Sequence, residues 1–178
     1  MQNKMYYNLS TLTQMDIYLF KQGSYTKMYE KFGAHPMTHK GKKGVHFAVW
    51  APNAKSVCVR GDFNDYKIDA HPLQLRSDDS GIWEGFIEDI AIGLTYKYHI
   101  VSLFHNIVHE KSDPFAFYSE VAPKSASRIY ELDNYKWNDK KWMEKRYKNN
   151  ACDSPISVYE MHVGSWRRNP LEDNRYLT

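Results

Sequence analysis

The loop at 61–66 combines residue types that can bind a sugar. It reads Gly-Asp-Phe-Asn-Asp-Tyr, so aromatic rings stand beside carboxylate and amide groups. The C–H face of a sugar ring can stack on an aromatic plane while its hydroxyl groups bond the polar side chains. In a structural interpretation, Phe63 fills the end of a core while Asp62 and Asn64 make local backbone bonds. Tyr66 then half-covers a strand edge. Aromatic residues are usually packing residues, so residue types alone favour the structural interpretation.

The strands on both sides of this loop must position it. Val45, Phe47 and Val49 alternate with other residues, and Val57 and Val59 alternate again after a Pro-Asn break, which predicts two strands joined by a turn. Further strand patterns cover 82–87, 95–101, 102–109 and 128–132. Short strands separated by frequent turns predict an all-β fold, an immunoglobulin-like β-sandwich over residues 41–133.

A short helix is expected before the sandwich, within an N-terminal helical extension at 1–40. Residues 11–14 have the spacing of a capping box, apolar residues follow at near-helical intervals, and Gly23 supplies a stop. A second turn or helix is expected over 25–32, and the Gly-Ala-His-Pro segment at 33–36 should end it.

The residues after the sandwich have a different character. Residues 134–155 are polar, basic and aromatic, and we interpret them as a linker whose tryptophans dock on neighbouring domains. Interleaved basic and aromatic residues also occur in proteins that bind single-stranded nucleic acid, but Asp139 and Glu144 dilute the pattern here. Residues 156–164 are predicted to form a strand of a different kind, within a last segment at 156–178.

Composition narrows the possible partners and compartment. The chain has 178 residues, and 24 Lys and Arg against 21 Asp and Glu give an interspersed net charge of +3, which supports neither a nucleic acid nor a membrane as partner. Cys58 and Cys152 lie far apart without a partner motif, which is typical of thiols in a reducing compartment. The sequence has neither a signal-peptide pattern nor an apolar run of membrane length, so a cytoplasmic protein is expected.

The histidines do not form a metal-binding pattern. His105 and His109 share one face of a predicted strand, and His35, His39 and His46 lie close together in the sequence. No spacing of cysteine and histidine matches a zinc site, so we expect solvated or hydrogen-bonded histidines and neither a metal nor a cofactor.

Six motifs, taken together and in order, resemble the N-terminal region of bacterial 1,4-α-glucan (glycogen) branching enzymes. They are GVHFAVWAPNA at 44–54, GDFN at 61–64, GIWE at 81–84, YKY at 96–98, DP at 113–114 and YEMHVGSWRR at 159–168. The resemblance implies that the sandwich is a glycogen-binding module of carbohydrate-binding module family 48. It also implies that 156–178 begins a truncated catalytic (β/α)₈ barrel, with a barrel strand near its start.

The resemblance implies three glucan-binding residues, Asn64, Tyr66 and Lys97. Gly61, Phe63 and Asn64 match the family motif, and Tyr66 stands where the family has a stacking tryptophan. Lys97 matches the family lysine that donates to sugar hydroxyls. The second tryptophan of dedicated glycogen-binding members has no clear counterpart, because residues 104–108 offer only Phe104, Ile107 and Val108.

The chemistry that the resemblance implies is retaining glycosyl transfer, which forms α-1,6 branches. The family's catalytic carboxylates follow later barrel strands, so we expect no catalytic residue here and an inactive fragment whose partners are α-1,4-glucan or glycogen and its own missing barrel. Glu160 and His162 should make a buried polar contact and not catalyse, because no second carboxylate accompanies them. Two alternatives are a non-catalytic glucan-binding or interaction module, and the N-terminal domain of a debranching or trehalose-forming relative.

Overall fold

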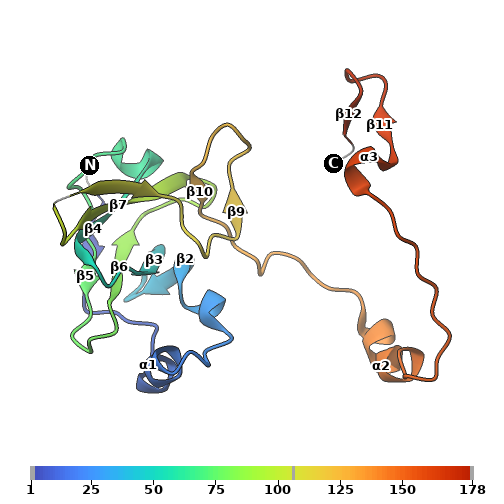
Figure 1. Cartoon of the computed structure of the whole chain (residues 1–178). Coiled ribbons are helices and arrows are strands. Elements are labelled where there is room, and N and C mark those ends of the chain that lie inside the picture. The colour runs from blue at the N-terminus through green and yellow to red at the C-terminus, as the bar shows by residue number, and fades with distance from the viewer. Residues whose placement is uncertain (1–2, 106, 177–178) are drawn as a thin grey trace. The chain divides into compact units, whose positions relative to one another are not determined.

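The computed structural model describes residues 3–105 and 107–176, which divide into two compact units. Unit 1 comprises residues 1–135 and unit 2 comprises residues 136–178. Unit 1 carries two antiparallel sheets, and unit 2 carries two helices and a short hairpin (Figure 1). No helix among the described residues is both long and apolar enough to cross a membrane.

The first sheet of unit 1 has the strand order β1-β6-β3-β2, and β5 pairs with β6. These strands are β1 (Met5–Tyr6), β2 (Gly33–His39), β3 (Lys42–Trp50), β5 (Gln74–Leu75) and β6 (Ile82–Glu88). All the pairings are antiparallel. Two of these strands, β1 and β2, precede residue 41, where the sandwich was predicted to begin. The sandwich therefore begins earlier in the chain than predicted.

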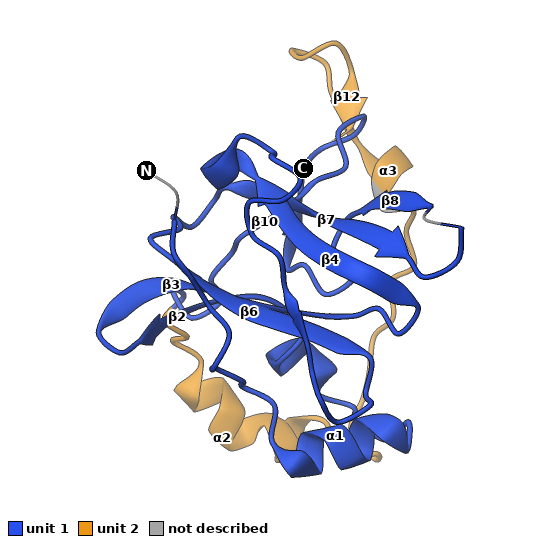
Figure 2. Ribbon diagram, turned by 90° about the vertical axis from the view of Figure 1, so that its left-hand side faces the viewer, with its two compact units in different colours: residues 1–135 blue, residues 136–178 orange. Residues whose placement is uncertain are grey.

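The second sheet has the order β4-β7-β10-β9, and β8 pairs with β7. These strands are β4 (Ala54–Gly61), β7 (Thr95–Ser102), β8 (Val108–Lys111), β9 (Tyr118–Ser119) and β10 (Ser127–Arg128). Figure 2 shows this sheet lying over the first one, as in a sandwich. Of the predicted strand at 128–132, only Arg128 lies in a strand, as the second residue of β10.

The core fills the space between the two sheets. Because side chains alternate along a strand, each sheet turns one set of apolar side chains inward. The fully buried members include Val45, Phe47, Val57, Val59, Ile87, Tyr96 and Tyr98. The alternation predicted for β3 and β4 is confirmed, and Phe63 packs against this core as the structural interpretation of its loop expects.

Asp113 holds the end of the core together. Its buried carboxylate accepts hydrogen bonds from the hydroxyl groups of Tyr96, at 2.6 Å, and Tyr98, at 3.0 Å. The backbone N–H of Phe115 donates to Asp113 Oδ1 at 2.8 Å. The backbone N–H of Asp113 itself donates to Ser127 Oγ, also at 2.8 Å. Burial raises the pKa of Asp113, and the tyrosine hydrogen bonds oppose that rise. The network ties β7 to the segment that returns across the sandwich.

The N-terminal segment covers the outer side of the first sheet. Helix α1 (Gln14–Lys21) begins after Thr13, which forms a capping box with Asp16 and not with the predicted pair at 11 and 14. Leu12 and Ile17 pack with Ile82 of β6 in a second apolar cluster. The predicted second helix is only a 3₁₀ turn, η1 (Met28–Glu30), and 33–36 opens β2 where a stop was expected.

Unit 2 differs from its prediction. The expected linker contains helix α2 (Lys140–Asn149). The strand expected at 156–164 is not formed in this chain: residues 155–162 have no regular structure and α3 (Val163–Trp166) follows. The chain then forms a hairpin of β11 (Arg168–Asn169) and β12 (Arg175–Tyr176).

The Asp113 network gives a prediction for stability. Asp113→Ala should lower the free energy of unfolding by about 3 kcal/mol, because two buried tyrosine hydroxyls and one backbone N–H would lose their acceptor. Urea unfolding followed by circular dichroism measures the change. Asp133→Ala, at an exposed position, is the matched control and should cost less than about 0.5 kcal/mol. Equal losses in the two variants would contradict the role given to Asp113.

A buried polar cluster connects the N-terminal segment to the first sheet. Glu84 accepts hydrogen bonds from Ser10 Oγ at 2.9 Å and from Arg76 Nη1 at 2.6 Å. His46 is fully buried beside this cluster, and its Nε2 lies 3.6 Å from Glu84 Oε2. Burial lowers the pKa of His46 to about 4, and the nearby positive groups of His35 and Arg76 act in the same direction. The folded protein therefore holds His46 neutral.

This lowered pKa predicts a loss of stability in mild acid. Between pH 6.5 and pH 4 the unfolded chain binds a proton at His46 that the folded chain does not, so the free energy of unfolding should fall by up to about 3 kcal/mol as the pH is lowered through this window. Burial raises the pKa of Glu84, whose contribution has the opposite sign near the acidic end. Urea unfolding at several pH values tests the prediction.

His46→Gln is the matched variant, because it keeps a polar side chain of similar size but cannot be protonated in this range. The lowered pKa of His71 contributes to the pH dependence of both proteins and cancels in the comparison. A flatter curve in the variant is expected. The same slope in both proteins would be inconsistent with a neutral buried His46.

Candidate functional site

The loop after β4 is shaped by the buried side chain of Asn64. Its Oδ1 accepts from the backbone N–H of Gly61 at 2.9 Å, and its Nδ2 donates to the Val59 carbonyl at 3.0 Å. The same nitrogen lies 2.9 Å from His71 Nδ1. These bonds fold residues 62–64 into a 3₁₀ turn, η2 (Asp62–Asn64). They also place Asn64 inside the protein, with both its polar atoms already paired.

Asp62 fixes the loop to the neighbouring strand β7. Its Oδ2 accepts from the backbone N–H of Thr95 at 2.7 Å and from Thr95 Oγ1 at 2.9 Å. A Cβ atom on Gly61 would lie 2.2 Å from the Thr95 carbonyl oxygen, so only glycine allows this close approach. The sequence interpretation expected local backbone bonds from Asp62, whereas the bonds reach across to β7.

Tyr66 is held in a conformation that non-glycine residues rarely adopt. Asp65 and Tyr66 have φ values of 52° and 55°, in the left-handed region. The Tyr66 N–H donates to the Gly61 carbonyl at 3.0 Å, and its carbonyl accepts from Arg60 Nε at 2.5 Å. Strained backbone of this kind costs on the order of 1 kcal/mol or more per residue and is concentrated at functional sites. The strained backbone therefore makes Tyr66 a candidate functional residue.

The side chain of Tyr66 lies on the outer face of the second sheet. Its hydroxyl is 2.5 Å from Thr95 Oγ1, whose own hydrogen points to Asp62, so the Tyr66 hydroxyl is the donor. The ring is half-buried, and burial raises the pKa of the hydroxyl group. The bonded hydroxyl fixes one end of a partly exposed aromatic ring.

Lys97 shares this outer face. It lies two residues after Thr95 on β7, so both point away from the buried Tyr96 and Tyr98. Its Nζ donates to Ser125 Oγ at 2.9 Å, and in the strand register it stands opposite Arg60. The structure thus places Tyr66 and Lys97 on one face, around Thr95 and Arg60, and leaves Asn64 beneath it.

A charged cluster around His99, the next outward-facing residue of β7, lies on the same face. Glu110 Oε1 lies 2.5 Å from Arg60 Nη1 and 2.7 Å from His99 Nδ1. Desolvation would raise the pKa of Glu110, but the hydrogen bonds from His99 and Arg60 outweigh it and lower the pKa. Sequence reasoning missed these residues. The alternation of Thr95, Lys97 and His99 along one strand was the signal that could have found them.

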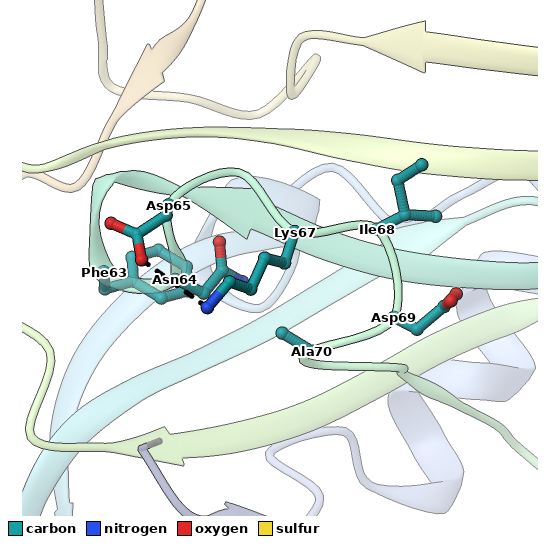
Figure 3. Close-up of a pocket in the computed structure, with 7 residues that line it drawn as sticks. All are labelled: Phe63, Asn64, Asp65, Lys67, Ile68, Asp69 and Ala70. Atoms are coloured by element: carbon teal, nitrogen blue, oxygen red, sulfur yellow. Dashed lines mark ion pairs between the residues drawn. The ribbon is translucent and has the colours of Figure 1, made fainter. Parts of the chain in front are cut away.

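A hollow of about 600 Å³ opens beside the same loop (Figure 3). Residues 63–65 and 67–70 line it, and Lys67 forms an exposed ion pair with Asp65 at its rim. Tyr66 is absent from this lining because its side chain turns toward Thr95. The loop therefore separates an aromatic and basic face from a mixed polar hollow.

The remaining candidates do not assemble into a site. Glu160 and His162 are exposed, so the buried contact expected for them is wrong, and His162 Nδ1 lies 2.9 Å from Ser165 Oγ. No group of three or more His, Cys, Asp or Glu that could hold a metal ion occurs in residues 3–105 and 107–176. Phe104, Ile107 and Val108 are exposed around the β7–β8 turn.

Two packed antiparallel sheets define unit 1 as a β-sandwich domain. Residues 31–116 match the family described as Carbohydrate-binding module 48 (Isoamylase N-terminal domain). With the relatives below, this match shows that the chain belongs with the N-terminal region of bacterial 1,4-alpha-glucan branching enzymes.

Two curated relatives support this assignment. The 1,4-alpha-glucan branching enzyme GlgB of Aquifex aeolicus is 47% identical over 169 residues, which cover 95% of this chain and 26% of the relative. The enzyme of the same name from Gloeobacter violaceus is 44% identical over 169 residues, which cover 95% of this chain and 23% of the relative. The chain thus spans about a quarter of the length of these relatives. Among solved structures, Klebsiella pneumoniae pullulanase complexed with maltotriose gives a TM-score of 0.47 at 28% identity, over 58% of this chain and 10% of that one.

Proposed function

We propose that unit 1 binds α-1,4-glucan chains on the outer face of the β4-β7-β8 sheet, through Tyr66 and Lys97. The observation that carries the proposal is the strained backbone of Tyr66 together with the bond that fixes its hydroxyl to Thr95. A ring held in this way loses little freedom when a ligand binds, which favours affinity. The name of the matching family and the names of the relatives agree with a glucan as ligand.

Each proposed contact has a separate physical role. A glucosyl ring stacks its C–H face on the exposed part of Tyr66, and its hydroxyl groups accept hydrogen bonds from Lys97 Nζ in exchange for the bond to Ser125. Asn64, the third residue inferred from the sequence, acts through the loop that it shapes, because its polar atoms are bonded inside the protein.

A second function, bracing the rest of a larger protein, is favoured by one observation. Leu103, Phe104, Ile107 and Val108 expose apolar side chains around the β7–β8 turn. Exposed apolar patches commonly mark contacts with another domain or protein. The two functions use different parts of unit 1, so they are compatible.

For the whole protein we propose retaining transfer of glucan chains that creates α-1,6 branches in glycogen, in the cytoplasm. The curated names and the two free thiols support this proposal. In the division proposed, the sandwich expected at 41–133 also takes in β1 and β2 from the extension expected at 1–40. A linker at 134–155 and the start of a catalytic barrel at 156–178 follow it. Residues 156–164 would become a barrel strand only when neighbouring strands supply its backbone hydrogen bonds.

Glucan binding can be tested by titrating maltoheptaose into the chain while amide signals are followed by NMR. The signals of Tyr66 and Lys97 should shift together and saturate. Tyr66→Ala should weaken this binding at least about tenfold, because the stacking surface is lost, and Lys97→Ala should weaken it less. Tyr147→Ala, at a tyrosine that is 93% exposed in unit 2, is the control and should bind like the unaltered chain. An absence of shifts with linear glucan would leave only the bracing function.

The position of the active site can be tested with the same chain. Incubation with amylose, followed by debranching and chain-length analysis, should show no new α-1,6 linkages. The physical reason is that retaining transfer needs two carboxyl groups about 5 Å apart across the bond, and those of a (β/α)₈ barrel come from the ends of several strands. Branching by the pure chain would refute this placement of the chemistry.

A further inference from the structure

A second aromatic hollow lies on the opposite sheet from Tyr66. It has a volume of about 360 Å³, and its lining includes Phe20, Lys21, Tyr25, Trp50 and Ser80. We refer to it as the Trp50 hollow. It lies at the end of β3, where α1 and the turn after it pass over the outer side of the first sheet. Its volume is within the range of about 300 to 1,000 Å³ that is typical of small-molecule sites.

Trp50 forms a rigid aromatic surface in this hollow. Its side chain is 55% exposed, although Ile82, its partner in the register of β6, is buried. The indole Nε1 donates to the Ser80 carbonyl at 3.1 Å, and the ring of Phe20 meets the indole edge-on, with centroids 5.9 Å apart. A Cβ atom on Gly81 would come within 3.3 Å of the same nitrogen, so the indole lies close to the backbone of the β5–β6 turn.

The lining combines this flat apolar surface with a polar rim. Lys21 donates to the Asp78 carbonyl at the edge of the hollow, and its exposed ammonium group has further protons to donate. Gly23, with a φ of +72°, borders the hollow, and a Cβ atom there would meet nothing within 4 Å. An exposed indole face with a nearby flexible cation suits a ring that has an apolar face and polar edges.

We infer that the Trp50 hollow is a second glucan subsite, which takes one or two glucosyl units of an α-1,4-glucan. The sugar ring stacks on the free face of Trp50, and its hydroxyl groups bond Lys21. The chemical class of the ligand rests on the proposed function of the module, whereas the site itself rests on the geometry of Trp50. The subsite is separate from Tyr66, because Trp50 ends β3 of the first sheet and Tyr66 lies in the loop after β4 of the second.

Two weak subsites on opposite sheets would let one module hold two segments of a branched polymer. Once one segment is bound, the second contact becomes intramolecular, and the overall affinity exceeds that of either subsite. A glucan long enough to reach both sheets, or one that carries branches, should therefore bind more tightly than maltoheptaose.

The test uses the whole chain and the indole N–H signals of its five tryptophans, with Trp50 assigned by substitution. Addition of maltoheptaose should shift the Trp50 indole signal and the Gly23 amide signal, with saturation. Both shifts should persist in Tyr66→Ala, since that substitution affects only the other sheet. Trp50→Leu should weaken the response of Gly23 at least tenfold while Lys97 still responds.

Two further variants control for folding. Lys21→Ala changes only the rim and should weaken the response of Trp50 at least threefold, even if Trp50→Leu proves unstable. Trp137→Leu replaces an exposed tryptophan of unit 2 and should leave every shift unchanged.

The outcomes separate the two proposals. Shifts at Lys97 with a motionless Trp50 signal overturn the second subsite and leave the proposed function intact. Shifts at Trp50 without any at Tyr66 or Lys97 support this subsite and overturn the Tyr66 site. A Trp50 signal that moves with protein concentration and not with glucan overturns the inference, because a second copy of the chain would then occupy the hollow.

Discussion

The buried carboxylate of Asp113 is the constraint on which the rest of unit 1 depends. Its bonds to Tyr96 and Tyr98 fix which side chains of β7 face the core. A shift of one residue in a strand exchanges its two faces, and a shift here would bury Lys97 and expose two tyrosines. The same hydrogen bonds that close the core therefore also set the outer face on which Thr95, Lys97 and His99 stand. The register of β7 therefore determines both the stability of the core and the position of Lys97 in the candidate site.

The candidate site is organised by bonds that cross between elements. The carboxylate of Asp62 accepts a hydrogen bond from the backbone of Thr95 in β7. The guanidinium of Arg60 donates to the Tyr66 carbonyl, and the Tyr66 hydroxyl donates to Thr95 Oγ1. Each bond opposes the strain of two successive left-handed residues, which would not persist in an isolated loop. The loop is thus held by its surroundings. Such a rigid aromatic ring suits a weakly binding ligand, since little conformational entropy is lost on association.

Sequence reasoning found the elements whose signals are local. The alternation in β3 and β4 was visible because Val45, Phe47, Val57 and Val59 all face the core between the sheets. Strand β2 was missed because its Gly-Ala-His-Pro start resembles a helix stop, whereas pairing with β3 determines its conformation. The strand expected at 156–164 is not formed for the converse reason: a strand needs partners for its N–H and C=O groups, and these residues have none among the described strands. That Tyr66 and Lys97 share a face depends on the register of β4 and β7, which composition cannot give.

The pairing of β1 with β6 has a practical consequence for how this domain is delimited. The family match begins at residue 31 and ends at residue 116, yet Met5 and Tyr6 form an edge of the first sheet and Ser127 bonds the backbone of Asp113 in the second. A polypeptide cut at the limits of the match would leave β6 with unpaired backbone groups and uncover the apolar residues under α1. Exposed edges of this kind promote aggregation. The smallest independently folding piece is therefore longer at both ends than the segment by which the family is recognised.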